Sequence, residues 1–279
     1  MKKTFIVLNK DKPNIEKTAA KLEKKLSDFG FEIISTNKHL DFFSALKKSD
    51  FLIALGGDGT IIHYAKHCAD INKPVLGINS GRLGFISKLE VSDLNLLEKL
   101  KKGAFDIDRR MMLNCRLIRK NGETTDFTAL NDIVISKGAV SKIIDIELSC
   151  GGRQVTEFRG DGIILSTPTG STAYALSAGS PIIAPKLECL IFTPICPHSL
   201  NSRGIIFDVN NMLEIKAKSA SGSPSFLTVD GESAIPLEDD DRIVVEKSPK
   251  YAQLIDLKNK TFFDVLNEKM SDREKNNEN

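Results

Sequence analysis

The segment around residue 56 constrains the fold of this chain more than any other part of its sequence. Five apolar residues at 51–55 lead into a turn made of Gly56, Gly57, Asp58, Gly59 and Thr60. Beyond the turn, apolar residues recur at positions 61, 62, 65, 68 and 69. An apolar run bounded by glycines is typical of a buried strand, and the later spacing is typical of a helix. The sequence therefore predicts a strand, a glycine-rich turn and a helix.

This turn has the composition of a phosphate-binding site that also carries an acid. Glycines leave room for a ligand, and their N–H groups form an anion site together with the start of a helix. Asp58 repels phosphate unless it binds a metal or accepts a proton, so the combination favours phosphoryl transfer to a hydroxyl. The alternative is a hairpin with an Asp-Gly turn. Helical spacing after Thr60 argues against that hairpin.

Composition limits the classes of protein to consider. A length of 279 residues suggests about two domains. The 39 basic residues nearly balance the 37 acidic ones, which disfavours a nucleic-acid partner. No apolar run is long enough for a signal peptide or a membrane span. The five cysteines form no Cys-x-x-Cys pair, so we expect reduced thiols in a cytoplasmic protein, without a zinc site.

In the first half of the chain, predicted strands alternate with predicted helices. The strands fall at 4–8, 31–35, 51–55 and 74–78, and the helices at 15–29, 40–48, 61–69 and 92–102. Asn14 is in the position of an N-cap for the first helix. This alternation predicts a doubly wound α/β domain with a parallel sheet, in which ligands bind at the carboxyl ends of the strands. The glycine-rich turn lies at such an end.

The pattern changes near residue 106. Alternating runs at 144–150 and 213–218 are typical of half-buried strands, and glycine turns separate such runs at 121–122, 151–152, 221–222 and 230–231. We therefore expect an α/β domain at 1–106 and an antiparallel β-sandwich at 107–257. A helical segment at 258–270 is expected to rejoin the first domain. The polar residues 271–279 are expected to form a disordered tail.

A second polar motif begins at Arg159. A predicted strand at 163–166 follows Asp161, and a turn rich in Thr, Ser and Gly then leads into a short helix around Tyr174. Such a turn supplies hydroxyl and backbone donors, and Tyr174 offers a flat face for stacking against a base. The alternative is a Thr-rich turn beside a core tyrosine.

The two motifs together resemble those of a known family. The turn at 56–60 resembles the shared motif of NAD kinases, diacylglycerol and sphingosine kinases and, more distantly, phosphofructokinase. The stretch 161–179 is similar to a long motif of the NAD kinases alone, as is the segment 195–200. Asn131 and Asp132 correspond to the family's Asn-Glu element. By this resemblance, which runs from the first strand to about residue 257, the chain is identified as a member of the NAD kinase family.

The resemblance implies transfer of the γ-phosphoryl of ATP to the 2′-hydroxyl of the adenosine ribose of NAD. It also implies that a divalent metal takes part, and Mg²⁺ is the metal expected. Asp58 is implied as general base or orienting acceptor, in a cleft between the two domains. The glycines Gly56, Gly57 and Gly59 are implied as the phosphate-facing backbone. Further binding residues are implied at Thr60, His63, Asn131, Asp132, Lys142, Arg159, Asp161, Thr172, Ala173, Tyr174, Ala175, Leu176, Ser177 and Glu232. No protein ligand to the metal is assigned.

Some of these residues have a plainer interpretation. His63 and His67 have metal-pair spacing, but no third ligand is near in sequence, and His63 at a solvated surface is the alternative to a phosphate contact. Lys142 and Glu232 could be solvated strand residues, and Arg159 could simply pair with Asp161. Asp132 also departs from the family, which usually has Glu at this position.

Two rival functions remain at this point. A lipid or diacylglycerol kinase is disfavoured because the stretch 167–179 is polar. A non-catalytic NAD(P)-binding regulator has no need for the acid Asp58. The sequence has no Gly-x-x-x-x-Gly-Lys-Ser/Thr motif, and no Gly-x-Gly-x-x-Gly follows the first strand, so it is neither a P-loop kinase nor a Rossmann dehydrogenase. Polyphosphate remains possible as the donor, and the family suggests a homo-oligomer, either a tetramer or a dimer.

Overall fold

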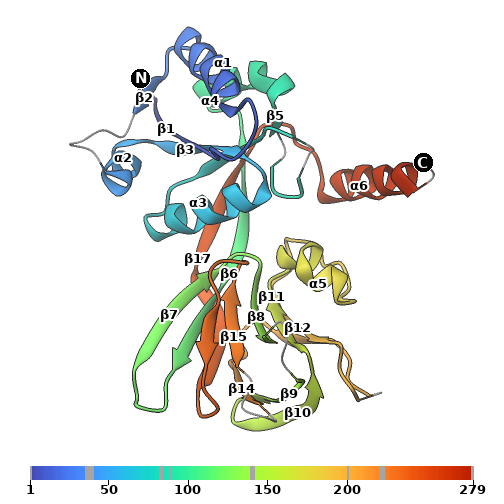
Figure 1. The fold of residues 1–279 in the computed structure, drawn as a ribbon. Coiled ribbons are helices and arrows are strands. Elements are labelled where there is room, and N and C mark those ends of the chain that lie inside the picture. Colours follow the sequence, from blue (N-terminus) through green and yellow to red (C-terminus); the bar gives the residue numbers. More distant parts are fainter. Residues whose placement is uncertain are drawn as a thin grey trace. The chain divides into compact units, whose positions relative to one another are not determined.

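The computed structural model describes residues 2–34, 41–81, 84–87, 89–138, 142–199, 201–219 and 224–277 (Figure 1). The chain divides into two compact units. Unit 1 comprises Met1–Arg109 and Ala252–Asn279, and unit 2 comprises Arg110–Tyr251. The sequence placed these boundaries near 106 and 257. The boundaries differ because two long strands, β6 (Asp106–Ile118) and β17 (Arg242–Asp256), run through them without a break.

Unit 1 contains a parallel sheet. Its strands β2 (Glu32–Ile34), β1 (Lys3–Leu8), β3 (Phe51–Gly56) and β4 (Val75–Asn79) lie in that order, and the end of β17 pairs with β4. The short strand β5 (Leu89–Glu90) also pairs with β4. The predicted doubly wound architecture is confirmed. Because the strand order reverses beside β1, the carboxyl ends of β1 and β3 form the position where such sheets bind ligands.

Helices cover both faces of this sheet (Figure 1). On one face lie α1 (Ile15–Asp28) and α4 (Leu97–Lys102), and on the other lie α2 (Phe42–Lys48) and α3 (Asp58–Asp70). Helix α4 follows a 3₁₀ turn at Val91–Leu96, so the helix expected at 92–102 is α-helical only in its second half. Leu22 and Leu26 of α1 are fully buried in one cluster with Ile53 and Leu55 of β3. This apolar contact holds β3 against α1.

Asn14 precedes α1 as expected, but it does not cap the helix with its side chain. Its backbone is left-handed, with φ of 58°, and its side chain makes no capping hydrogen bond. Asn tolerates this conformation better than most residues do. The prediction of an N-cap was therefore right in position and wrong in its hydrogen bond.

Unit 2 is a β-sandwich of two sheets with antiparallel neighbours. The first contains β6, β7 (Thr124–Ala129), β9 (Ile144–Cys150), β10 (Arg153–Gly160), β14 (Leu213–Ser219) and β17. The second contains, in order, β13 (Ile205–Asp208), β12 (Cys189–Ile195), β11 (Gly162–Ser166), β8 (Asp132–Lys137), β15 (Ser225–Val229) and β16 (Ile235–Leu237). The predicted sandwich is confirmed.

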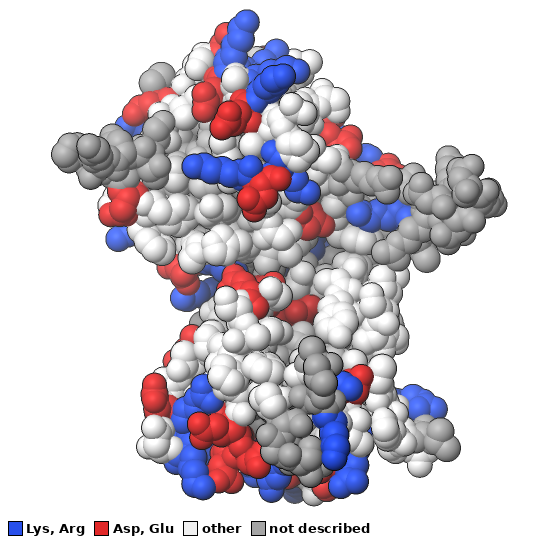
Figure 2. Space-filling view, viewed as in Figure 1, with Lys and Arg blue, Asp and Glu red and all other residues white. Residues whose placement is uncertain are grey.

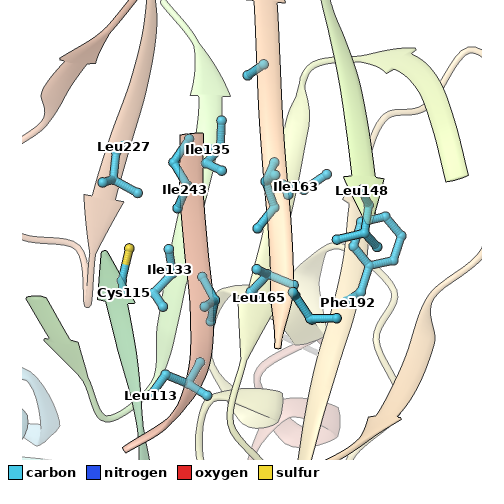
Figure 3. Packing of buried hydrophobic residues seen from close by; sticks show 14 of the residues in the cluster. Leu113, Cys115, Ile133, Ile135, Leu148, Ile163, Leu165, Phe192, Leu227 and Ile243 are labelled. Carbon is cyan, nitrogen blue, oxygen red and sulfur yellow. The ribbon is translucent and has the colours of Figure 1, made fainter. Parts of the chain in front are cut away.

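The sandwich core consists of branched aliphatic side chains from both sheets. Figure 3 shows Ile133, Ile135, Ile163 and Leu165 of the second sheet among residues such as Leu148 of the first. These positions alternate along their strands, as expected when one face of each sheet is buried. Asp132, Ser166 and their like-facing neighbours consequently lie on the other face of the second sheet.

The glycine turns of unit 2 lie where left-handed backbone is needed. Gly122, Gly151, Gly152 and Gly231 all have positive φ. Such angles strain a residue that has a Cβ, which explains the glycines. The turn expected at 221–222 lies outside the described residues.

The C-terminal segment differs from the prediction. Helix α6 (Phe262–Asn277) belongs to unit 1 and continues through 271–277, where the sequence predicted disorder. This stretch contains no Gly or Pro, and its Glu, Lys and Arg residues favour helix even without burial. Among the described residues, no helix is long and apolar enough to cross a membrane. Figure 2 shows acidic and basic side chains interspersed over the face in view, in keeping with the net charge of +2.

Candidate active site

The start of α3 forms the first part of the candidate site. Strand β3 ends at Gly56, Gly57 precedes the helix, and Asp58 is its first residue. The alternative hairpin is therefore wrong. The first N–H groups of a helix have no partner within it, and the helix dipole makes this end positive. The backbone of Asp58, Gly59 and Thr60 thus presents donors suited to an anion.

The three glycines of this turn differ in the space around them. A Cβ on Gly57 or Gly59 meets no atom of the described residues within 4 Å, so these two positions are open to a ligand on that side. A Cβ on Gly56 lies 2.5 Å from Oγ1 of Thr60. Gly56 is thus required for the helix to begin so close to its strand. Thr60 in turn accepts a hydrogen bond of 3.2 Å from Nδ2 of Asn9, which follows β1.

The carboxylate of Asp58 is held by the loop that follows β4. Oδ2 accepts a hydrogen bond of 2.8 Å from the N–H of Phe85. Oδ1 accepts two from Ser87, one of 3.2 Å from its N–H and one of 3.0 Å from its Oγ. A carboxylate accepts about four hydrogen bonds, so the described residues leave about one position open, and it lies on Oδ2.

Gly84 and Asn79 complete this arrangement. A Cβ on Gly84 lies 1.8 Å from Oδ1 of Asp58, so only glycine allows the loop to approach the carboxylate. Asn79, at the end of β4, donates a 3.1 Å hydrogen bond to Oγ of Ser87 and accepts one of 2.8 Å from the N–H of Gly81. A continuous chain of hydrogen bonds therefore runs from β4 through Ser87 to Asp58.

The sequence did not point to Gly84, Phe85, Ser87 or Asn79 as site residues. One signal was present, because Asn79 stands at the carboxyl end of the strand next to β3, where ligands of such sheets bind. The contacts with Asp58 have no local signal, since they join residues 27 and 29 positions apart.

His63 lies on the surface of α3. Its ring centroid is 5.0 Å from those of both Tyr64 and His67. No group of three or more His, Cys, Asp or Glu that could hold a metal occurs in the part of the chain that the structure describes. The His63–His67 pair therefore has no described third ligand.

Other predicted binding residues lie within unit 2, where Asn131 and Asp132 meet the motif at 167–177. The N–H of Thr167 donates a 2.9 Å hydrogen bond to the carbonyl of Asn131, and its Oγ1 donates one of 2.7 Å to the carbonyl of Leu130. A Cβ on Gly170 lies 2.1 Å from the same Asn131 carbonyl. The predicted binding residue Asn131 is thus packed against the turn at 167–170, which directly precedes the predicted binding residues at 172–177.

Asp230 holds this turn from the other side, and the sequence did not indicate it. Its carboxylate accepts hydrogen bonds from the N–H groups of Leu130, Asn131 and Asp132, at 2.9, 2.7 and 3.1 Å. Asp230 has a φ of 50° and forms a tight turn with Gly231, closed by the N–H of Glu232 donating to the carbonyl of Val229. Glu232 is exposed on this turn.

Asp132 is a buried acid beside unsatisfied polar atoms. Only 5% of its surface is exposed, and burial, with the nearby charge of Asp230, raises the pKa of its carboxyl from 3.8 to about 7. Oδ1 of Asn131 and Oγ of Ser166 are buried without a hydrogen-bond partner among the described residues. Ser166 is directly opposite Asp132 in the sheet. Unpartnered buried groups are costly in free energy, which suits a site that a ligand with hydroxyl groups completes.

The residues predicted to line a nucleoside pocket lie on or just before helix α5 (Tyr174–Ser177), and they differ in exposure. Ala175 is fully buried and packs on Val134 and Ile164 of the second sheet. Tyr174 is 47% exposed, so the alternative of a core tyrosine is wrong and its ring is accessible. The hydroxyl of Thr172 donates to the carbonyl of Thr169 at 3.1 Å. The other predicted lining residues are Ala173 and Leu176, both half-buried, and Ser177, which is exposed.

Three predicted binding residues lie elsewhere in unit 2. Arg159 pairs with Asp145 at 2.6 Å and Asp161 with Lys137 at 2.9 Å, so the alternative, an ion pair between Arg159 and Asp161, is wrong. Asp161 precedes β11 and Thr167 follows it, which separates them by roughly 20 Å of extended chain. Lys142 is exposed before β9, near the same end as Arg159. The structure does not bring these residues to Asn131.

Comparison with known proteins adds independent information. Residues 4–104 match the family model described as ATP-NAD kinase N-terminal domain, and residues 130–257 match the one described as ATP-NAD kinase C-terminal domain. The NAD kinase of Thermoanaerobacter sp. (strain X514) is 38% identical over 284 residues, which cover 98% of this chain and all of that protein. The NAD kinase of Caldanaerobacter subterraneus subsp. tengcongensis is 43% identical over 227 residues, with 81% and 80% covered.

A solved structure is similar over nearly its whole length. The crystal structure of an NAD kinase from Archaeoglobus fulgidus in complex with ATP superposes with a TM-score of 0.76 and 26% sequence identity. The match covers 95% of this chain and 96% of that one. The similarity therefore extends across both units.

Proposed function

Because the chain belongs to the NAD kinase family, we propose that Asp58 is the residue that acts on the hydroxyl group of NAD. The activity is that of a phosphotransferase with an alcohol acceptor, and NAD and ATP are the substrates. The observation that carries the assignment is the geometry of the Asp58 carboxylate. Three donors fix it at the positive end of α3, and about one acceptor position on Oδ2 remains for a substrate hydroxyl.

The reaction can be followed through the residues of the chain. The free N–H groups at the start of α3 bind phosphate oxygens, and the helix dipole favours their negative charge. Oδ2 of Asp58 accepts the proton of the ribose 2′-hydroxyl, whose oxygen attacks the γ-phosphorus of ATP. The bond from that phosphorus to the bridging oxygen breaks, and ADP leaves with the electron pair. The products are NADP and ADP.

NAD is held, in this proposal, by the turn of Asn131 and Asp132. Asp132 and the unpartnered Oδ1 of Asn131 accept hydrogen bonds from ribose hydroxyls, which resolves the buried acceptors. The exposed ring of Tyr174 stacks on a base, as single aromatic side chains commonly do. The family match of both halves to NAD kinase domains removes the reason to prefer a lipid kinase or a regulator without activity.

A divalent metal is proposed to bind together with the nucleotide, and Mg²⁺ is the metal expected. The described residues offer no cluster of three or more His, Cys, Asp or Glu. Mg²⁺ fits such a chain, because it keeps several waters and binds mainly through substrate phosphates. When bound, it neutralises charge on the phosphate oxygens.

Three further properties are proposals of the same kind. ATP is the expected donor, with polyphosphate as the alternative. The five cysteines are all free, which suits a reducing, cytoplasmic location. The chain is expected to form a homo-oligomer, either a tetramer or a dimer, and light scattering of the purified protein measures this directly.

A coupled assay tests the proposed reaction. Purified protein is incubated with Mg²⁺, either ATP or polyphosphate, and either NAD, NADH or a short-chain diacylglycerol. NADP formation is followed with an NADP-specific dehydrogenase, and lipid phosphorylation with radiolabelled donor. We expect NADP from NAD and ATP and no labelled lipid. Labelled lipid without NADP would contradict the proposed substrate.

A further inference from the structure

The C-terminal helix α6 contacts the loop that holds Asp58. Phe85, whose N–H donates to Oδ2 of Asp58, has its ring centroid 6.4 Å from that of Phe262, with 36° between the ring planes. Nζ of Lys269 lies 5.0 Å from the centroid of the same Phe85 ring. Phe262 and Lys269 are thus two residues of one helix that contact a single side chain of the loop.

The spacing on α6 explains why these two residues act together. Phe262, Val265 and Lys269 are separated by three and four residues, so they lie on one face of the helix. Val265 is 1% exposed and marks this face as the one that packs on unit 1. Phe263, the neighbour of Phe262, is 62% exposed, and its ring centroid lies 5.5 Å from that of Phe262. It provides a matched control of the same residue type, because the described ring contacts of Phe85 are with Phe262 and Lys269.

The path of the chain into α6 is also fixed. Nζ of Lys99 donates a 2.7 Å hydrogen bond to the carbonyl of Leu257, and Nζ of Lys258 lies 2.5 Å from Oδ2 of Asp93. At the start of the helix, the N–H of Thr261 donates to Oδ2 of Asp264, and the N–H of Asp264 donates to Oγ1 of Thr261. This reciprocal capping resembles a capping box and sets where the helix begins. The face toward Phe85 is therefore defined by several independent contacts.

The loop at 84–87 has two anchors for the two oxygens of Asp58. Ser87, which binds Oδ1, is held by Asn79 at the end of β4. Phe85, which binds Oδ2, is held through its ring by α6. Loss of the second anchor leaves Oδ1 bound and frees the carboxylate to rotate. The oxygen that becomes misplaced is Oδ2, which has the remaining acceptor position.

We infer that α6 positions the Asp58 carboxylate through Phe85, with Phe262 and Lys269 as positioning residues for phosphoryl transfer. This inference rests on the proposed role of Asp58. A displacement of about 1 Å in a reacting group can reduce the rate about a hundredfold, so a contact remote from the substrate can control kcat. Neither residue needs to touch the substrate for this effect.

Steady-state kinetics of matched variants test the inference. We expect Phe262→Ala to lower kcat about tenfold while the KM values for NAD and ATP change less than about threefold, because substrate binding is retained and orientation is lost. Phe263→Ala is the control and should keep kcat within about twofold of the unmodified protein. Lys269→Met keeps an apolar stem, removes the cation over the ring, and should lower kcat about threefold. Phe262→Tyr restores the ring and should recover most of the activity.

A double variant separates this inference from the role of Asp58 itself. If α6 acts through Asp58, adding Phe262→Ala to Asp58→Asn should give no further loss in kcat. Equal kcat values for Phe262→Ala and Phe263→Ala, or full additivity with a damaging Asp58→Asn, would overturn the link through α6 alone. Asp58→Asn with near-normal kcat would instead overturn the proposed role of Asp58. If Phe262→Ala does not fold, Lys269→Met still tests the inference. A normal kcat for the Lys269→Met variant would contradict it.

Discussion

Two aspartates in the two units have opposite surroundings. Asp58 is surrounded by donors, namely the N–H of Phe85 and the N–H and hydroxyl of Ser87. Asp132 is 5% exposed, and its burial, with the nearby charge of Asp230, raises its pKa to about 7. An aspartate side chain is thus held in a fixed orientation by donors in unit 1, whereas in unit 2 an aspartate is buried with few hydrogen-bond donors among the described residues. A carboxylate that is fixed in orientation, such as that of Asp58, is suited to act on a reacting group. A buried carboxylate with few hydrogen-bond donors, such as that of Asp132, is suited to bind the hydroxyl groups of a ligand.

After substitution of Asp58 itself, the largest expected effect comes from the contact that orients this carboxylate. Gly84→Ala adds a Cβ 1.8 Å from Oδ1, so the loop and the carboxylate must separate. We expect kcat to fall by about 10²-fold, because the hydroxyl loses its aligned acceptor. Gly81→Ala is the control, since its Cβ comes no closer than 3.7 Å to a described atom, at Asn79. Initial rates of NADP formation measure both, and similar rates would show that the loop does not orient Asp58.

The next effect concerns NAD binding at Asp132. A charged acceptor contributes about 1.5–3 kcal/mol, so Asp132→Ala should raise the KM for NAD about tenfold or more while ATP is largely unaffected. Asp132→Glu supplies the usual family residue in a pocket fitted to the shorter chain, and it should be better than Ala and no better than Asp. Isothermal titration of NAD into each variant measures this. Equal dissociation constants for all three would take Asp132 out of the site.

The raised pKa of Asp132 predicts a dependence on pH. The folded carboxyl holds its proton up to a pH of about 7, whereas the unfolded one releases it near 3.8. Between about pH 4 and 7 the unfolded chain releases this proton while the folded chain keeps it, so the free energy of unfolding decreases as the pH rises and levels off above about pH 7, where both forms are ionised. Compared with Asp132→Asn, the Tm of the unmodified protein should fall by about 5 °C over this range. Parallel Tm profiles would contradict the burial of an ionisable group.

Titration of Asp132 should also affect NAD binding, but in the opposite direction: the free energy of unfolding decreases as the pH rises, whereas the affinity for NAD increases. Hydroxyl donors favour the ionised form of Asp132, so the affinity for NAD should rise between about pH 6 and 8. The Asp132→Asn variant should lose this dependence. Titrations at several pH values measure it, and a pH slope that persists in the variant would assign the titration to another group.

The smallest expected effect lies outside both aspartate sites. Residues 271–279 contain no apolar side chain, so their removal should change the free energy of unfolding by about 0.5 kcal/mol or less. Helical backbone up to Asn277 does not alter this expectation, since most of a helix's stability comes from packing of an apolar face and this stretch has no apolar residue. Thermal melts and rates of the shortened chain check it. A clear loss of activity would show that the end of α6 also supports the Asp58 loop.

The sequence predicted what local patterns encode. The strand, turn and helix from Phe51 to Asp70 followed from apolar spacing. The family resemblance implied binding roles for Asn131 and for residues 172–177, but the contact of Asn131 with Thr167 was not predicted. The supports of the site were not predictable, because they join distant residues. Asp230 binds N–H groups about 100 positions away, and Phe262 meets Phe85 across the chain. Arg159 and Asp161 pair with neighbouring strands because register, which the sequence alone leaves open, sets their partners.

The direct test of the account is the rate of the Asp58→Asn variant. Asparagine keeps the shape of the side chain and removes its ability to accept the proton. If Asp58 accepts the proton, kcat falls by roughly 10²–10⁴ in this variant, while the dissociation constant of NAD, held by Asn131 and Asp132, changes little. A kcat within about threefold of the unmodified protein would contradict this role of Asp58.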